Sequence, residues 1–96
     1  MLFRSTSEHL HKFVKHMLST DKDWALRALV RLNETNRFEA GDRVFLTSVA
    51  HQYITKKHIS DKQLMWVMKK MHKNSEAIIE LSDKPKLEAM AATWTP

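Results

Sequence analysis

The residues best suited to bind a ligand lie in one stretch of the chain, between Lys56 and Lys73. If residues 61–73 form a helix that turns about 100° per residue, their apolar side chains share one face. The opposite face then carries a single tryptophan among lysines. Lysines neutralise phosphate groups, and an aromatic ring can stack on a base or fill a pocket on a protein. The candidate binding residues are Lys56, Lys57, Lys62, Trp66, Lys69, Lys70 and Lys73.

The charge distribution points to the same stretch. The formal net charge of the chain is +5, and the segment 56–73 contains six lysines against one acidic residue, Asp61. A concentrated basic segment favours an anionic partner, either nucleic acid or an acidic protein surface.

A purely structural interpretation of this stretch stays open. Trp66 would then pack beneath the C-terminal segment, and the lysine side chains would extend past it to water. The segment would be an ordinary solvated helix face that binds nothing.

No other group of residues suggests chemistry. His9 and His11 would point to opposite sides of a helix, and His9 and His16 would lie about 10.5 Å apart along its axis, too far to share an ion. The chain has no Cys, no glycine-rich phosphate loop and no nucleophile elbow. We therefore expect no metal site, no cofactor and no enzymatic activity.

The composition predicts an all-α fold. The chain has 96 residues, enough for one domain, with one Gly and two Pro. Because Gly and Pro serve turns and hairpins, their scarcity favours helices joined by short polar loops. No apolar run approaches the roughly 18 residues needed to span a membrane, and the first five residues lack the apolar stretch of a signal peptide. A cytoplasmic location, that of the host cell if a phage encodes the protein, is expected.

Periodicity and capping signals predict a bundle of four to five short helices. The clearest start is at Ser60, where Ser60–Gln63 forms a capping box flanked by Ile59 and Leu64 as a hydrophobic staple. Ser5–Glu8 is a second capping box. The Gly41–Asp42 pair marks either a kink or a helix start capped by Asp42. The predicted helices are about 6–18, 21–33, 37–55, 61–73 and, more weakly, 85–93.

The apolar stripes of these helices predict the core. The helix 21–33 is apolar nearly all round, so it should lie centrally in the bundle. Met90 and Trp94 are candidates to dock on the core from the C-terminal segment. The predicted core residues are Leu10, Phe13, Met17, Leu29, Phe45, Val49, Leu64 and Met68.

The stretches Phe45–Ala50 and Ile59–Gln63 resemble a helical hairpin of small bacteriophage-encoded proteins. In that hairpin, a helix with a Phe-Leu pair meets a second helix that opens with Ile or Leu, Ser or Thr, any residue, Lys and Gln. The resemblance covers about a quarter of the chain. It implies a phage or mobile-element origin and a link to nucleic-acid handling, including inhibitors of host complexes, and it carries over no functional residues.

Two functional hypotheses follow. In the first, a small non-enzymatic protein binds nucleic acid, or a host complex that handles it, through the basic–aromatic face of helix 61–73. Reversing the charges of Lys69 and Lys70 should then weaken binding and leave stability unchanged. In the second, the protein is a protein-only interaction module or homodimer whose interface is formed by the apolar helix 21–33 and the six methionines of the chain. The hairpin of helices 37–55 and 61–73 also permits a DNA-reading helix-turn-helix.

Overall fold

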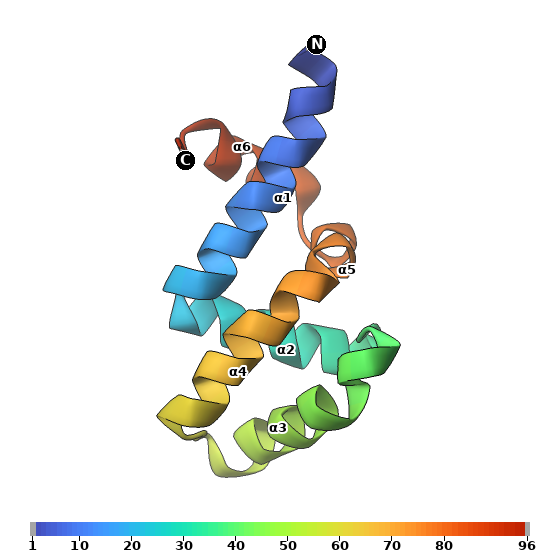
Figure 1. The fold of residues 1–96 in the computed structure, drawn as a ribbon, viewed down its shortest axis with the longest axis vertical. Coiled ribbons are helices and arrows are strands. Elements are labelled where there is room, and N and C mark those ends of the chain that lie inside the picture. Colours follow the sequence, from blue (N-terminus) through green and yellow to red (C-terminus); the bar gives the residue numbers. More distant parts are fainter. Residues whose placement is uncertain (1, 96) are drawn as a thin grey trace.

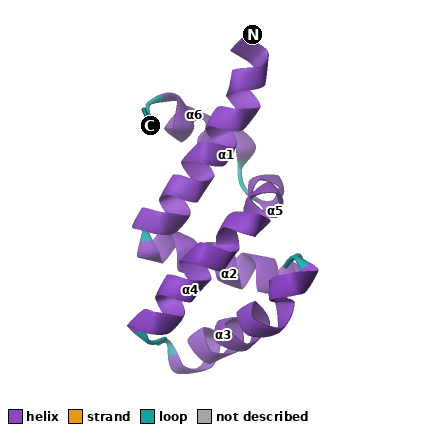
Figure 2. Ribbon diagram, in the orientation of Figure 1, coloured by secondary structure: helices purple, strands orange, loops and turns teal. Residues whose placement is uncertain are grey.

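The computed structural model describes residues 2–95, with side chains from residue 8 onward. Over these residues it is helical and contains no strand, which confirms the all-α prediction (Figures 1 and 2). The elements are α1 (Leu2–Thr20), α2 (Lys22–Thr35), the 3₁₀ turn η1 (Ala40–Asp42), α3 (Arg43–Lys56), α4 (Asp61–Met71), the 3₁₀ turn η2 (His72–Asn74), α5 (Ser75–Leu81) and α6 (Lys84–Ala92).

The second helix, α2, is the centre of the bundle. It contacts α1, α3, α4 and α5, and Figure 1 shows it crossing the middle of the molecule. Four of its apolar side chains are buried in the core: Ala25, Leu26, Leu29 and Leu32. The predicted central place of this helix is therefore confirmed, and these four residues are not available as a surface for a partner.

Half of the predicted core residues are buried, and the other half lie at the edge of the core. Leu10, Phe13, Leu29 and Val49 are buried, whereas Met17, Phe45, Leu64 and Met68 are half-buried at its edge. On α3 the inward positions are Leu46, Val49 and Ala50, and on α4 they are Val67 and Met71. A helical stripe covers a wide arc, so the sequence fixes the stripe but not which member points most directly at the neighbouring helix.

The first helix begins earlier than predicted. It already includes Leu2, so Ser5 lies within α1 and is not its N-cap. The predicted capping box at Ser5–Glu8 is therefore wrong. No Pro or Gly precedes Ser5, so nothing in residues 2–4 prevents the helix from extending backward. The side chains of Ser5, Thr6 and Ser7 lie outside the described residues.

The third helix begins later than predicted. Asn36 ends α2 in the left-handed conformation, with φ 55°, and α3 starts only at Arg43. Residues 37–39 are not helical, Glu39 is extended, Phe38 is buried in the core, and η1 follows. The alternative with a separate turn before a true helix start is therefore correct. Asp42 occupies the N-cap position of α3, but its carboxylate makes no capping hydrogen bond there.

The fourth helix begins where predicted. The Ser60 hydroxyl accepts a hydrogen bond from the Gln63 amide at 3.1 Å, and the Ser60 amide donates to Gln63 Oε1 at 2.9 Å. This reciprocal pair is the predicted capping box. It satisfies two backbone donors that the first helical turn would otherwise leave without partners.

Replacing Ser60 with Ala is expected to lower the free energy of unfolding by about 1 kcal/mol, because the first turn of α4 loses its side-chain acceptor. Urea denaturation measures this change. Ser48→Ala is the matched control, since Ser48 is exposed within α3 and its loss should change stability by less than about 0.5 kcal/mol. Equal effects of the two substitutions would show that the cap contributes nothing.

The C-terminal third splits into short helices. Helix α4 ends at Met71, two residues before its predicted end, and η2 leads into α5. Asp83 caps α6 by accepting a hydrogen bond from the Lys86 amide at 3.4 Å. After α6, the Trp94 ring lies 5.7 Å from Phe13 and 5.1 Å from His16 of α1. Trp94 therefore docks as predicted, whereas Met90 remains 37% exposed.

Histidines join α1 to the C-terminal third. His9 Nε2 donates to the carbonyl of Ala91 at 2.7 Å, and His72 Nε2 lies 2.7 Å from the Ser19 hydroxyl. Burial lowers the pKa of His72 below its ordinary value of 6.5, and the positive charge of Lys15 lowers it further, against the opposing effect of a backbone hydrogen bond at Lys15. The folded protein therefore prefers neutral His72.

This preference predicts a pH dependence of stability. As the pH falls below 6.5, the unfolded chain takes up a proton at His72 before the folded chain does, so the free energy of unfolding decreases. Above that pH both states are neutral and the contribution is complete. Melting temperatures between about pH 7.5 and pH 5 should therefore decline less steeply in His72→Gln than in the wild type. An unchanged slope in His72→Gln would contradict the role of His72.

Candidate functional site: the outer surface of α4

The junction between α3 and α4 determines which side of α4 faces outward. Besides capping the helix, Gln63 exchanges two side-chain hydrogen bonds of 3.1 Å with Gln52 of α3. Val67 and Met71 then point into the core. The side chains left outside include Lys62, Trp66 and Lys69.

Trp66 is the main exposed aromatic residue of this surface. Its side chain is 39% exposed, and the neighbouring Met65 is 54% exposed. The Lys69 ammonium lies 5.3 Å from the centroid of the Trp66 ring, and the Lys70 ammonium lies 5.9 Å from it. Both distances are within the range of cation–π attraction. One tryptophan is thus presented to solvent with two lysine ammonium groups over its ring.

Two of the predicted lysines have a structural partner, Asp42. This carboxylate is 2% exposed, and Lys70 Nζ donates to its Oδ1 at 3.2 Å. Lys73 Nζ lies 3.8 Å from Oδ2, close enough for an ion pair but leaving that oxygen without a hydrogen bond among the described residues. A buried carboxylate needs such partners, because desolvation penalises an unpaired charge.

Asn74 helps to bring Asp42 to these lysines. Its buried side chain accepts a hydrogen bond from the Glu39 amide at 2.7 Å and donates one to the Lys70 carbonyl at 3.3 Å. The segment before α3 is thereby tied to the end of α4. Lys70 Nζ also lies 5.7 Å from the ring centroid of Phe45, so this half-buried side chain contacts Phe45, Trp66 and Asp42.

The seven predicted residues therefore separate into two groups. Lys70 and Lys73 hold Asp42, so the expectation that reversing Lys70 leaves stability unchanged conflicts with this arrangement. The remaining residues are exposed, with Lys56 ending α3 and Lys57 in the turn that precedes α4 (Figure 1). We call this second group the α4 basic–aromatic surface: Lys56, Lys57, Lys62, Trp66 and Lys69.

The role of Asp42 was not predicted from the sequence. Asp42 precedes an apolar helix, which is typical of a helix cap. Its partners lie 28 and 31 residues further along the chain, at spacings that have no local pattern. Only its sequence neighbour Gly41 hinted that the chain changes direction there.

Comparison with known proteins does not assign a function to this surface. The chain matches no known protein family, no curated protein and no solved structure. Within the described residues, no three His, Cys, Asp or Glu side chains gather in a way that could hold a metal ion. None of the described helices combines the length and the apolar character required to cross a membrane.

Proposed function

We propose that this protein binds single-stranded nucleic acid through the α4 basic–aromatic surface and has no enzymatic activity. The observation that carries the proposal is the exposed Trp66 ring with the Lys69 ammonium 5.3 Å from its centroid. Proteins that bind single strands combine basic residues along the backbone with aromatic rings on which bases stack. Lys56, Lys57 and Lys62 would extend the phosphate contacts along the α3–α4 turn.

The ion pairs at Asp42 support this division of roles. Lys70 and Lys73 would hold Asp42 and so fix the segment before α3 against α4. Lys62 and Lys69 form no ion pairs among the described residues and can bind phosphates. Trp66 is exposed beside these ion pairs. Lys70 already restricts the position of the Trp66 ring. Stacking of a base on this ring would therefore cost little side-chain conformational entropy.

The resemblance to phage hairpins suggests a setting for this activity. The protein would act in a host cell cytoplasm on a complex that exposes single-stranded nucleic acid, as an inhibitor or accessory factor. The protein-only alternative draws less on α2, since four of its apolar residues, Ala25, Leu26, Leu29 and Leu32, are buried. A homodimer would draw on exposed apolar side chains such as Val44 and Met65.

Fluorescence anisotropy with a labelled single-stranded oligonucleotide of about 15 nucleotides tests the proposal. Affinity should fall steeply between about 50 mM and 200 mM salt, because bound lysines release counterions. Lys69→Glu should weaken binding about tenfold, and Trp66→Ala at least as much, since a stacked base contributes about 1–3 kcal/mol.

Lys84→Glu is the control for charge, because Lys84 is exposed at the start of α6, away from α4. It should weaken binding by less than about threefold, through the long-range field alone. Equal effects of Lys84→Glu and Lys69→Glu would exclude a localised site on α4. A strong preference for duplex DNA would favour the helix-turn-helix alternative, and a stable dimer that binds no oligonucleotide would favour the protein-only one.

A further inference from the structure

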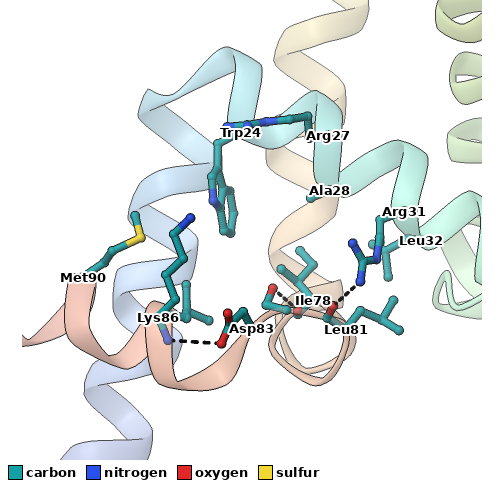
Figure 3. A pocket seen from close by; sticks show the side chains of 12 residues that line it. Trp24, Arg27, Ala28, Arg31, Leu32, Ile78, Leu81, Asp83, Lys86 and Met90 are labelled. Atoms are coloured by element: carbon teal, nitrogen blue, oxygen red, sulfur yellow. Dashed lines mark hydrogen bonds between the residues drawn. The ribbon is translucent and has the colours of Figure 1, made fainter.

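A pocket of about 440 Å³ opens between α2 and the hairpin of α5 and α6 (Figure 3). This volume is within the range of small-molecule sites. No residue of α3 or α4 lines it, so it is separate from the α4 basic–aromatic surface. The lining residues are Trp24, Arg27, Ala28, Arg31, Leu32, Ile78, Leu81, Ser82, Asp83, Lys86, Leu87 and Met90.

The floor of the pocket is apolar. Leu32, Ile78 and Leu87 belong to the buried core, and the half-buried Trp24 ring forms one wall. Met90, an apolar side chain that is 37% exposed, lies beside Lys86 at the α6 edge of the pocket (Figure 3). Water forms few hydrogen bonds with such a lining, so its displacement by an apolar part of a ligand is favourable.

The rim of the pocket is positively charged. Arg27 and Arg31 are one helical turn apart on α2, and Lys86 extends from α6 toward Trp24 on the other side (Figure 3). Arg31 donates to the carbonyl of Leu81 at 3.0 Å, whereas neither Arg27 nor Lys86 forms an ion pair within the described part of the chain. The only carboxylate in the lining belongs to Asp83, which caps α6.

We propose that this pocket binds a small amphipathic anion, a compact apolar body that carries one carboxylate. The lining combines three cationic side chains with a single carboxylate around an apolar floor, an imbalance of charge that a bound anion would reduce. The ligand's carboxylate would pair with Arg27 and Lys86, whose charged groups form no ion pair within the described residues, and its apolar part would lie against Trp24. Arg31 shapes the wall through its bond to Leu81.

Isothermal titration with 2-naphthoate tests the proposal, and uncharged 2-naphthamide of the same shape isolates the effect of the charge. The naphthoate should bind at least ten times more tightly than the amide. Arg27→Gln and Lys86→Gln should each weaken naphthoate binding about three- to tenfold and leave amide binding unchanged. Ala28→Phe, which fills the pocket without altering its charge, should abolish binding of both compounds.

Two further measurements keep the result specific. Lys69→Gln removes the same charge from the α4 surface and should not change naphthoate affinity. In a ¹H–¹⁵N spectrum, naphthoate should shift the indole signal of Trp24 and not those of Trp66 or Trp94. Thermal melting of Ala28→Phe confirms that the variant is folded; if it is not, the two Gln variants decide alone. Equal affinity for naphthoate and naphthamide, no binding of naphthoate below 1 mM, or binding of an acidic peptide only would overturn the proposal.

Discussion

Lys70→Glu is expected to lower the free energy of unfolding by about 3 kcal/mol, which is a large part of the stability of a domain of this size. The reason is Asp42. Its carboxylate is 2% exposed and has its hydrogen bond from Lys70. Replacing the ammonium with a second carboxylate leaves Asp42 desolvated beside a like charge. Lys69→Glu, one residue earlier and exposed, should change stability by less than about 0.5 kcal/mol.

A double-mutant cycle separates the ion pair from general packing. Lys70→Met keeps most of the side-chain volume and should cost about 2–3 kcal/mol alone, because Asp42 loses its donor. In an Asp42→Asn background the same change should cost less than about 1 kcal/mol, since no buried charge remains to be unpaired. Guanidinium denaturation of the four proteins measures the coupling. Equal costs of Lys70→Met in the two backgrounds would mean that the Asp42–Lys70 pair does not stabilise the fold.

Leu46→Ala is expected to have the other large effect, a loss of about 3–5 kcal/mol. Leu46 is fully buried where α3 packs on α2, so its truncation leaves a cavity in the middle of the core. Phe45→Ala, at the adjacent half-buried position, should cost only about 1–2 kcal/mol, because the ring already meets water and the Lys70 side chain. Thermal and urea unfolding of both variants compare the two positions. A larger loss from Phe45→Ala would place the inward face of α3 at Phe45, as the sequence pattern alone suggested.

Features that depend on interactions between residues close in the sequence were predictable, and features that depend on contacts between distant residues were not. The start of α4 was predictable because a capping box lies within four consecutive residues, and the central place of α2 because its apolar character surrounds the helix. The start of α3 was not predictable, since the non-helical residues 37–39 are held by Phe38 in the core and by the hydrogen bond between Glu39 and Asn74, 35 residues away.

The candidate sites follow the same rule. The placement of Trp66 and Lys69 on the outer side of α4 came from helical periodicity alone and agrees with the structure. The commitment of Lys70 to Asp42 depends on a contact between distant parts of the chain and has no local signal. The pocket has no local signal in the sequence either, because its lining comes from α2, α5 and α6, which are far apart along the chain.

The indole signal of Trp66 tests the central claim most directly. The three tryptophans lie in different environments: Trp66 on α4, Trp24 in the pocket and Trp94 against α1. Titrating the ¹⁵N-labelled protein with a single-stranded oligonucleotide at low salt should shift the Trp66 indole signal and leave those of Trp24 and Trp94 in place. The same titration of Lys69→Glu should need about tenfold more oligonucleotide for the same shift. An unmoved Trp66 signal at saturating oligonucleotide, or shifts confined to Trp24 or Trp94, would contradict the assignment of the binding surface to α4.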